Sequence, residues 1–303
     1  MRTICKIRKT MRNIAFIINP IAGTIGKRKM INLIEKNVDT SVWTHDIVVT
    51  QYVGHATELA SHYAQLGFDA VVAVGGDGTV NEVACGLIGT NTALGVVPSG
   101  SGNGFARHLG IPIRIPSAID RLNRCGAMRC DYGLVNDKPF FVTCGCGFDA
   151  HISEEFQKAD KRGIKTYVEK IFTEIMEYTP EHYSLHSEES DIETDAFLIT
   201  CANCNQWGNA AQIAPKASIQ DGKMDITIVN KFPLAVAPAL ALRLFTKTVA
   251  DSYYIHTLKT QEVTLTRPEG APFHIDGDPV QLPAEVTIRI IEDGLNVLVE
   301  KRY

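Results

Sequence analysis

The sequence contains no hydrophobic run that is long enough to cross a membrane. Its most apolar stretch extends from Leu234 to Phe245, which is shorter than the roughly 20 residues of a membrane-spanning helix and is interrupted by Pro238. The start of the chain is basic but has no uninterrupted apolar core, so it is unlike a secretory signal. We therefore expect a cytoplasmic protein without a transmembrane helix, and both Met1 and Met11 remain open as the start of translation.

An excess of positive charge is also missing. The formal net charge is −4 at pH 7, whereas proteins that bind nucleic acid rely on clustered Lys and Arg side chains against the phosphate backbone. We therefore expect no nucleic-acid partner.

The eight cysteines do not follow the pattern of a disulfide framework, and reduced thiols in the cytosol explain them. Two pairs have a second interpretation, because Cys144 with Cys146 and Cys201 with Cys204 could together supply four zinc ligands. Neither pair is accompanied by the second closely spaced pair that a zinc ribbon has. We expect buried thiols, with a zinc site as the alternative.

Several familiar nucleotide-binding motifs are absent. No GxxxxGK[ST] segment occurs, which excludes a P-loop enzyme, and the GSGNG segment is too short for a GxGxxG dinucleotide fingerprint and follows the wrong strand. The signatures of protein kinases are missing as well.

The composition is that of a globular protein, with 45% hydrophobic and 21% charged residues. A chain of 303 residues is long enough for two domains. Its first half alternates short β-branched runs with helical patterns, which predicts an α/β domain with a doubly wound, largely parallel sheet. The expected strands are residues 13–19, 45–50, 69–76 and 93–98, and the expected helices are residues 56–67 and 79–89.

From about Lys138 the pattern changes to strands joined by turns, which predicts a mainly antiparallel second domain. The polar stretch from Ser187 to Asp195 is typical of a solvated hairpin loop. The expected strands are residues 140–148, 196–203, 223–230, 262–267, 285–291 and 295–300, and the expected helices are residues 163–178 and 234–245.

The densest functional signal is the segment VVAVGGDGTVNEV, in which a buried strand leads through Gly75, Gly76, Asp77, Gly78 and Thr79 into a helix. Glycines permit positive φ and let backbone N–H groups approach a ligand, and the helix N-terminus that follows favours negative charge. The segment therefore predicts a phosphate-binding turn. Because Asp77 would repel a phosphate, a Mg²⁺ ion or a substrate hydroxyl is expected beside it. The alternative is a plain turn with Asp77 as the helix cap.

Two further turns follow predicted strands. Gly100–Gly104 offers the hydroxyl of Ser101 and the amide of Asn103 to a phosphate or a ribose. The turn Asn19–Gly23 also ends a strand, and Lys27 lies just beyond it. Open α/β sheets bind ligands at the carboxyl ends of their strands. Three such turns at one edge therefore predict a site for a polyphosphate.

Six segments occur in the order and approximate spacing of one enzyme family: NPIAG, TQYVGHA, GGDGTVNEV, PSGSGNGFARHLGIP, IAPKASIQDGKMDITIV and HIDGDPV. Together they resemble the lipid kinase family that contains bacterial diacylglycerol kinases and sphingosine kinases, over nearly the whole chain. GGDGT alone is also found in NAD kinases and relatives of phosphofructokinase, so the ordered set carries the resemblance. It implies a phosphofructokinase- or NAD-kinase-like catalytic domain over residues 11–135 and a C-terminal β-sandwich domain over residues 136–291, with residues from about 292 to 303 returning to the first domain.

The resemblance also implies ATP in the cleft of a two-domain protein. A structural Mg²⁺ site is implied at the Asp221 carboxylate and the carbonyls near Ser218 and Lys223, with a simple hairpin turn as the alternative. The residues that the resemblance assigns to ATP are Asn19, Pro20, Gly23, Thr50, Gly75, Gly76, Asp77, Gly78, Thr79, Asn81, Glu82, Ser101 and Asn103.

The segment HIDGDPV places Asp276 and Asp278 on either side of Gly277. In the family this segment usually reads DGE and supplies the proposed base. The shorter Asp278 leaves open which carboxylate acts, and a turn with two exposed acids is the alternative. A second departure is Gly104, where many bacterial diacylglycerol kinases carry an acid, and this turn is closer to that of sphingosine kinases.

We therefore expect ATP-dependent transfer of the γ-phosphate to a hydroxyl of a membrane lipid, such as diacylglycerol, a related glycerolipid or a sphingoid base. Asp77 is expected near the metal or the acceptor. Peripheral contact with the inner face of the membrane is expected through the basic start and apolar helix faces, and Arg107 and His108 either meet an anionic headgroup or cap a helix end. A homodimer is left open. The alternatives are an NAD kinase-like enzyme and a non-catalytic regulator that binds nucleotide or lipid.

Overall fold

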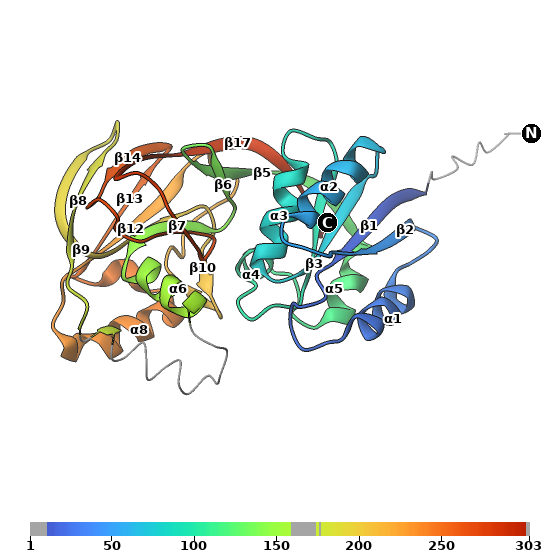
Figure 1. Cartoon of the computed structure of the whole chain (residues 1–303), viewed down its shortest axis with the longest axis horizontal. Coiled ribbons are helices and arrows are strands. Elements are labelled where there is room, and N and C mark those ends of the chain that lie inside the picture. Colours follow the sequence, from blue (N-terminus) through green and yellow to red (C-terminus); the bar gives the residue numbers. More distant parts are fainter. Residues whose placement is uncertain (1–10, 159–173, 176, 301–303) are drawn as a thin grey trace, which may run out of the picture. The chain divides into compact units, whose positions relative to one another are not determined.

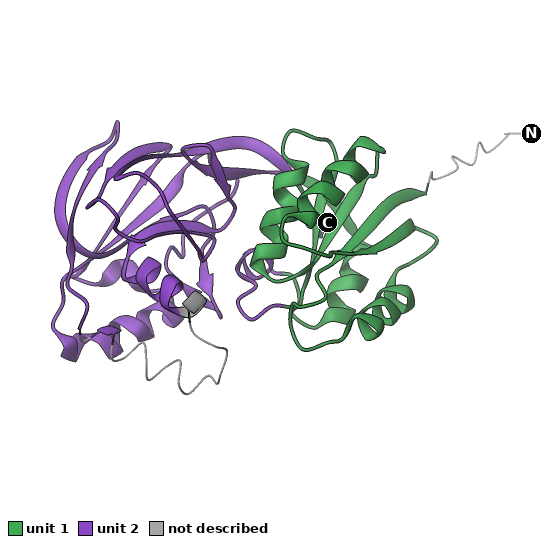
Figure 2. Ribbon diagram, in the orientation of Figure 1, with its two compact units in different colours: residues 1–99, 111–128, 296–303 green, residues 100–110, 129–295 purple. Residues whose placement is uncertain are grey.

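The computed structural model describes residues 11–158, 174–175 and 177–300. The chain divides into two compact units, which Figure 2 shows in different colours. Each unit contains segments that are distant in the sequence. The first consists of the residues up to Ser99, Ile111–Met128 and the residues from Asn296, and the second consists of Gly100–Gly110 and Arg129–Leu295.

The sequence-based domain limits, 11–135 and 136–291, stay a prediction. The compact units differ from these limits because residues 100–110 and 129–135 group with the second unit. The predicted helix over residues 163–178 lies for the most part outside the described residues.

The first unit is built on a parallel sheet, as the sequence predicted (Figure 1). The strand order is β4–β3–β1–β2, and Val297 near the end of β17 pairs in parallel with Leu94 of β4. Every residue of β3 and β4 is buried, as expected for strands that are covered on both faces. The strands are β1 (Arg12–Ile18), β2 (Trp43–Val49), β3 (Ala70–Gly75), β4 (Ala93–Pro98) and β17 (Glu285–Glu300).

Helices cover both faces of this sheet. On one face Phe16 lies in an apolar cluster with Ile34 of α1 and Ile119 of α5. Side chains alternate along a strand, so the other face is left to α2 and α3. These two helices pack closely at Gly86, where a Cβ atom would lie 2.5 Å from the carbonyl oxygen of Thr57. The helices are α1 (Lys27–Asn37), α2 (His55–Gln65), α3 (Asp77–Leu87) and α5 (Ile115–Leu122).

The second unit is an antiparallel β-sandwich, and β9 is its central strand. β9 pairs with β7, β8 and β12, and β15 pairs with β7 and β16. The strands are β5 (Cys125–Val135), β6 (Lys138–Phe140), β7 (Thr143–Gly147), β8 (Glu181–His186), β9 (Asp191–Ala202), β10 (Gln206–Gly208), β11 (Ala211–Gln212), β12 (Met224–Asn230), β13 (Ile255–Thr260), β14 (Glu262–Thr266), β15 (Phe273–Ile275) and β16 (Asp278–Val280). The helices are α4 (Gly104–His108), α6 (Phe148–Lys158), the 3-10 turn η1 (Leu234–Val236), α8 (Ala237–Thr246) and the 3-10 turn η2 (Val249–Asp251).

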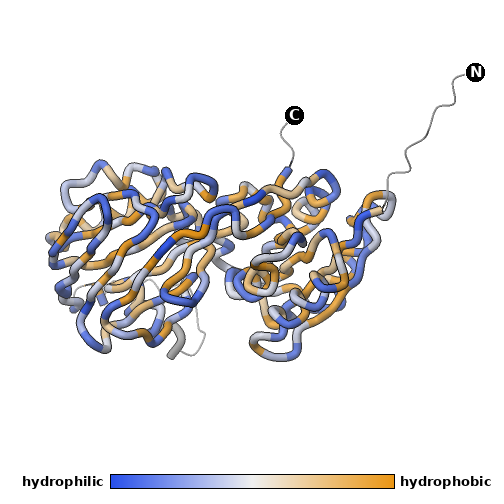
Figure 3. Tube along the Cα trace, turned by 90° about the horizontal axis from the view of Figure 1, so that it is seen from above, coloured by the Kyte–Doolittle hydropathy of each residue, from blue (hydrophilic) through white to orange (hydrophobic). Residues whose placement is uncertain are grey.

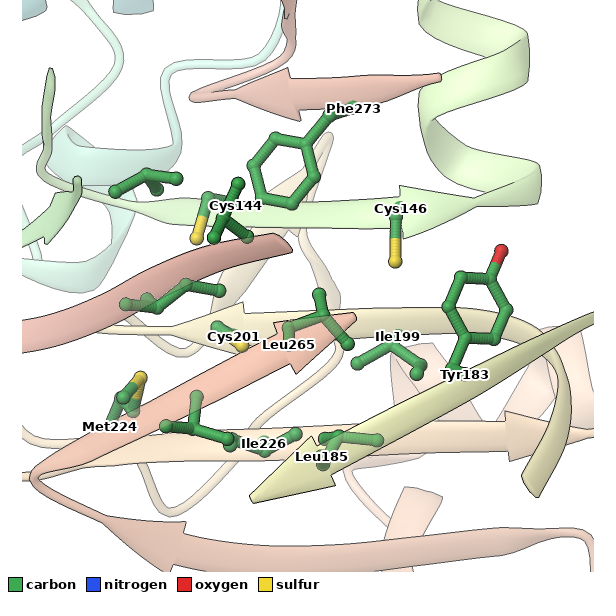
Figure 4. Close-up of a cluster of buried hydrophobic side chains, with 14 of the residues drawn as sticks. Cys144, Cys146, Tyr183, Leu185, Ile199, Cys201, Met224, Ile226, Leu265 and Phe273 are labelled. Carbon is green, nitrogen blue, oxygen red and sulfur yellow. The ribbon is translucent and has the colours of Figure 1, made fainter. Parts of the chain in front are cut away.

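The core of the second unit contains three of the cysteines that could have formed a zinc site. Figure 4 shows Cys144, Cys146 and Cys201 among Tyr183 and Phe273 and aliphatic side chains of the strands. Burial raises the pKa of the Cys144 and Cys146 thiols well above the usual value, so both stay protonated. Within the described residues, no group of three or more His, Cys, Asp or Glu side chains could hold a metal. The buried thiols are part of the apolar core.

Some of the predicted elements differ from those in the structure. The loop predicted over residues 187–195 ends at Asp191, where β9 begins, because polar and partly buried residues alternate along its outer half. The strands predicted over 285–291 and 295–300 form one continuous strand, β17. Strand β5 was not predicted, because CGAMRCDYGLV mixes glycines and charges with its apolar residues.

Hydropathy follows the layers of both units, with hydrophobic stretches along the strands and hydrophilic ones at many loops (Figure 3). None of the helices in the described part of the chain has the length and apolar character needed to span a bilayer.

Candidate functional site

The GGDGT turn joins β3 to α3 in the first unit. β3 ends at Gly75, and Gly76 precedes the helix with φ −92°. The sequence analysis expected these glycines for positive φ, and that reason is wrong. Gly75 is required by a close approach instead, since a Cβ atom there would lie 2.3 Å from Oγ1 of Thr79. The turn is therefore tight because the helix folds back onto the end of the strand.

Asp77 lies in the first turn of α3 and does not cap it. The N-cap residue is Gly76 and Asp77 is the first residue of the helix, so the alternative of Asp77 as the N-cap is wrong. The first backbone N–H groups of a helix lack acceptors within the helix and form its positive end. Asp77 is half-buried there and its Oδ1 atom is covered. The N–H groups suit a phosphate, and the carboxylate suits a cation that accompanies one.

The turn after β1 contacts the GGDGT turn directly. Nδ2 of Asn19 donates a hydrogen bond to Oγ1 of Thr79 over 3.0 Å. Gly23, with φ +73°, lies so close to β4 that a Cβ atom would be 2.1 Å from the carbonyl oxygen of Ser99. The backbone N–H of Ser99 in turn donates to the carbonyl of Gly75 over 2.8 Å. The ends of β1, β3 and β4 thus form one connected set of turns.

The other residues assigned to ATP in the first unit occupy different places. Thr50 follows β2, and its N–H donates to the carbonyl of Ile18. Pro20 is exposed and Asn81 is half-buried on α3. Glu82 contacts the start of α2, because its Oε2 accepts the backbone N–H of Ala56 over 3.2 Å. Glu82 therefore holds two helices together, and the ATP contacts of the whole set stay a prediction.

The glycine-rich turn Gly100–Gly104 belongs to the second unit and is held from within. Asn103 has φ +51° and is buried. Its amide accepts the N–H of Gly100 over 3.0 Å and donates to the carbonyl of Gly100 over 2.7 Å. Asn103 thus closes the turn with the amide that the sequence analysis offered to a ligand. Ser101, by contrast, is exposed.

The two basic residues of α4 also support this turn. Nε of Arg107 donates to the carbonyl of Gly102 over 3.0 Å, and Nδ1 of His108 accepts the N–H of Asn205 over 3.2 Å. Burial lowers the pKa of His108, so its ring is neutral at pH 7. Neither of the two expected roles, a headgroup contact or a helix cap, describes these bonds.

The acid turn, Ile275–Asp278, connects β15 to β16. Asp276 and Gly277 have φ +50° and +89°, the signs that a two-residue hairpin turn requires. The carboxylate of Asp276 accepts N–H groups of three successive residues at 2.8–3.2 Å, namely Phe141, Val142 and Thr143. Asp278 is exposed on the edge strand. The two carboxylates are therefore not equivalent.

A buried polar group under the acid turn was missed from the sequence. His274, which is 2% exposed, makes a 3.0 Å hydrogen bond through Nε2 to Oδ2 of Asp149, which is 7% exposed. Thr200 donates to the same carboxylate oxygen over 2.9 Å. The sequence could have suggested His274, because it lies two residues before Asp276. Its partner Asp149 is more than a hundred residues away along the chain, so the pair could not be predicted from a local pattern.

The turn that the resemblance assigns to Mg²⁺ contains a different cation. Oδ2 of Asp221 lies 2.6 Å from Nζ of Lys259, which is also 3.2 Å from Asp225. Burial alone would lower the pKa of Lys259, but the two carboxylates raise it, so the ammonium stays charged. Oxygen donors suit Mg²⁺, yet the one carboxylate assigned to it is already paired. As arranged, Ser218, Asp221 and Lys223 do not fit Mg²⁺, and that site stays a prediction.

Comparison with known proteins finds a matching family model for each half of the chain. Residues 13–135 match the family model described as the diacylglycerol kinase catalytic domain, and residues 142–299 match the YegS C-terminal NAD kinase beta sandwich-like domain. A diacylglycerol kinase from Bacillus anthracis str. Sterne has a similar solved structure, with a TM-score of 0.75 at 20% identity over 95% of this chain and 97% of that one. This likeness shows the shared fold.

Curated relatives match most of the sequence, across both domains. The chain is 32% identical to a diacylglycerol kinase of Bacillus subtilis (strain 168), over 88% of this chain and 90% of that protein. It is 30% identical to a probable lipid kinase YegS-like of Enterobacter sp. (strain 638), over 80% of this chain and 82% of that protein. With both domains matched in order, the chain belongs to the diacylglycerol kinase family of lipid kinases.

Proposed function

We propose that this family member transfers the γ-phosphate of ATP to a hydroxyl of a membrane lipid, such as diacylglycerol or a sphingoid base. The observation that carries the proposal is the connected set of turns at the ends of β1, β3 and β4, beside the first turn of α3. The N–H groups in the first turn of α3 would bind phosphate oxygens, and the hydrogen bond from Asn19 to Thr79 holds the turns in place for them.

Asp77 would hold the Mg²⁺ ion that accompanies ATP. When bound, this ion neutralises charge on the phosphates during transfer. The Asp77 carboxylate fits such a cation because it is half-buried beside the turn that would bind the phosphates. The chain's own contribution is then positioning and fixed charge, which is most of what phosphoryl transfer requires.

The acid turn would supply the base. The lipid hydroxyl oxygen forms a bond to the γ-phosphorus, the bond from that phosphorus to the β–γ bridging oxygen breaks, and ADP leaves. The hydroxyl proton passes to the carboxylate of Asp276 or Asp278, a contribution of roughly a hundred- to ten-thousand-fold in rate. No covalent intermediate with the protein is needed.

Radiolabelled ATP tests the proposal when it is offered with diacylglycerol vesicles, sphingosine and NAD in parallel. We expect label in a lipid. Label in NAD would instead support the NAD kinase-like alternative, and ATP binding without any labelled acceptor would indicate a regulator.

Asp77→Asn is the variant that tests the site. It should lower kcat at least about a hundredfold, because a fixed charge at the phosphates is lost. Glu35→Gln, at an exposed acid on α1 of the same unit, is the matched control and should keep wild-type activity. Full activity in Asp77→Asn would remove Asp77 from the mechanism.

We further propose that α8 contacts an anionic lipid bilayer, at the inner face of the cytoplasmic membrane. Leu242 and Phe245 on this helix are 62% and 58% exposed, whereas Leu240 on its other side packs into an apolar cluster. Residues 231–250 contain no acid, and Lys231 and Lys247 are exposed there. Apolar side chains flanked by lysines suit a surface of anionic lipids. The homodimer stays a prediction.

A further inference from the structure

Next to the acid turn, three paired residues form a row across three neighbouring strands. His274 on β15 pairs with Gly145 on β7, and Gly145 pairs with Thr200 on β9. The carboxylate of Asp149, in the first turn of α6, lies over this row and binds both ends of it, His274 through Nε2 and Thr200 through Oγ1.

The middle position of the row is a glycine for a steric reason. A Cβ atom at Gly145 would lie 3.1 Å from Oδ2 of Asp149 and 2.4 Å from the carbonyl oxygen of Ile199. Ordinary van der Waals contact needs more space than that. The absent side chain therefore makes room for the buried carboxylate.

The imidazole of His274 reaches from Asp149 to the acid turn. Its Nδ1 accepts the backbone N–H of Gly277 over 3.3 Å. A nitrogen that accepts a hydrogen bond carries no proton, so the hydrogen-bond pattern assigns the ring as neutral with its proton on Nε2, donated to Asp149. The ring thus links a buried carboxylate to the residue between Asp276 and Asp278.

Burying a carboxylate and an imidazole is costly compared with burying apolar side chains of the same size. Apolar side chains can occupy the neighbouring positions, since Cys144 and Cys146 of β7 and Ile199 of β9 are part of the apolar core. A polar pair in this place is therefore poorly explained by stability. The pair contacts the acid turn through His274, whose ring accepts the N–H of Gly277, the residue between the two candidate acids.

We propose that His274 and Asp149 are positioning residues for the base: Asp149 fixes the ring of His274, which holds the Gly277 N–H and thereby the two carboxylates of the acid turn. This inference rests on the proposed kinase function. The carboxylate of Asp276 accepts the N–H groups of Phe141, Val142 and Thr143, and His274 adds a separate hydrogen bond to the turn at Gly277. With both in place, the positive φ values at Asp276 and Gly277 are maintained.

Two substitutions at His274 separate its two hydrogen bonds. In His274→Asn the amide oxygen is one bond from Cγ, as Nδ1 is, so the acceptor for Gly277 is kept and the bond to Asp149 is lost. In His274→Gln the amide nitrogen is one bond further out, as Nε2 is, so the bond to Asp149 is kept and the acceptor for Gly277 is lost.

The expected result is a split in kinetics. His274→Gln should lower kcat about a hundredfold with the KM for ATP unchanged, because a misplaced base costs on this order, whereas His274→Asn should lose less than about tenfold. Thr227→Val is the control, since it removes another buried hydrogen bond of the second unit, from Thr227 to the carbonyl of Ile213. It should lower the Tm without changing kcat.

Amide hydrogen exchange gives a readout that does not need activity. The N–H groups of Gly277 and of residues 141–143 should exchange faster in His274→Gln than in the wild type or in Thr227→Val. If His274→Gln does not fold, Asp149→Asn serves as the milder variant, with a smaller change in the same direction.

The outcomes distinguish this inference from the proposed function. If the wild-type protein transfers no label from ATP to a lipid, the proposed kinase function is wrong. The exchange rate of the Gly277 N–H still tests whether His274 holds the acid turn. The inference would be overturned if both His274 variants lost kcat equally and in proportion to their loss of Tm. It would also be overturned if His274→Gln kept the wild-type kcat and the wild-type exchange rate at Gly277.

Discussion

Asp276 and Asp278 are two residues apart in the sequence, yet their carboxylates have different surroundings. Asp276 accepts three backbone N–H groups and has positive φ, so it is part of the structure of the turn. Asp278 is exposed on β16. A loss of activity on replacing either acid therefore has a different meaning at each position.

Asparagine substitution should separate the two acids. In Asp276→Asn an NH₂ group replaces one acceptor oxygen and faces backbone donors, so we expect the free energy of unfolding to fall by about 1–3 kcal/mol. Asp278→Asn should stay within about 0.5 kcal/mol of the wild type. Urea unfolding measures both values. A large kcat loss in Asp278→Asn with unchanged stability would identify Asp278 as the base, and an equal stability loss in the two variants would contradict the distinction.

The site was predictable from sequence as far as local patterns reach. A strand followed by glycines and a helix predicted the GGDGT turn, because that pattern is complete within a few residues. The bond from Asn19 to Thr79 was not predictable, since it depends on β1 and β3 lying side by side. The sequence pattern also predicted that the Asn103 side-chain amide binds a ligand. In the structure Asn103 has positive φ, and this amide accepts a hydrogen bond from the N–H of Gly100.

Among the elements, the antiparallel pair of β12 and β13 determines which cation Asp221 contacts in this structure. Asp225 and Lys259 face each other in register on these strands, and Asp221 lies just before β12. The Lys259 ammonium therefore contacts the carboxylate that the resemblance assigns to Mg²⁺. Pairing partners in a sheet cannot be read from a motif, so this contact was invisible in the sequence.

Lys259→Met should make the stability of this strand pair sensitive to metal. Without the ammonium, the carboxylates of Asp221 and Asp225 lose the ion pair that joins them, and we expect the Tm to fall. Added Mg²⁺ should recover part of the loss in this variant, and EDTA should leave the Tm of the wild type unchanged. Thermal unfolding with and without Mg²⁺ is the measurement. A wild-type Tm that drops in EDTA would restore the metal site that the resemblance implies.

Among the helices that the structure describes, α8 exposes the large apolar side chains Leu242 and Phe245. The double variant Leu242→Glu and Phe245→Glu should weaken binding to vesicles of phosphatidylcholine and phosphatidylglycerol by at least about tenfold, since two apolar side chains no longer enter the lipid. Activity on a short-chain soluble lipid should be unchanged. Vesicle sedimentation measures the binding.

The control for α8 is Leu66→Glu, which places the same charge at an equally exposed Leu, 59% accessible, at the end of α2. This variant should bind vesicles as the wild type does. Equal binding by the α8 variant would exclude the helix as the docking surface.

At the scale of the whole molecule, the last strand belongs to both units. β17 pairs with β14 in the second unit and, from Asn296, with β4 in the first. The sequence suggested two strands because Glu292, Asp293 and Gly294 look like a turn. Asp293 does have φ +52°, and its N–H bonds to Asp131, so the strand passes through an irregular residue without ending.

A chain that stops at Leu295 should lose stability mainly in the first unit. It lacks Val297 and Leu298, which are 0% and 3% exposed, and each such side chain contributes about 1.5–3 kcal/mol on burial. Hydrogen exchange should rise in β4 and stay low in β9. A chain that stops at Glu300 is the control and should match the wild type. Full protection of β4 in the shorter chain would show that the strand is dispensable.

The return of β17 to β4 also bears on how the protein folds during synthesis. The ribosome releases the first parallel strands early, but their sheet still lacks its neighbour beside Leu94. That neighbour arrives only with residues 296–300, after the β-sandwich has been translated. The turns at the ends of β1, β3 and β4 can therefore reach their final stability only after residues 296–300 have been translated. A nascent chain cut off before these residues would contain the strands of the sandwich and an incomplete first unit.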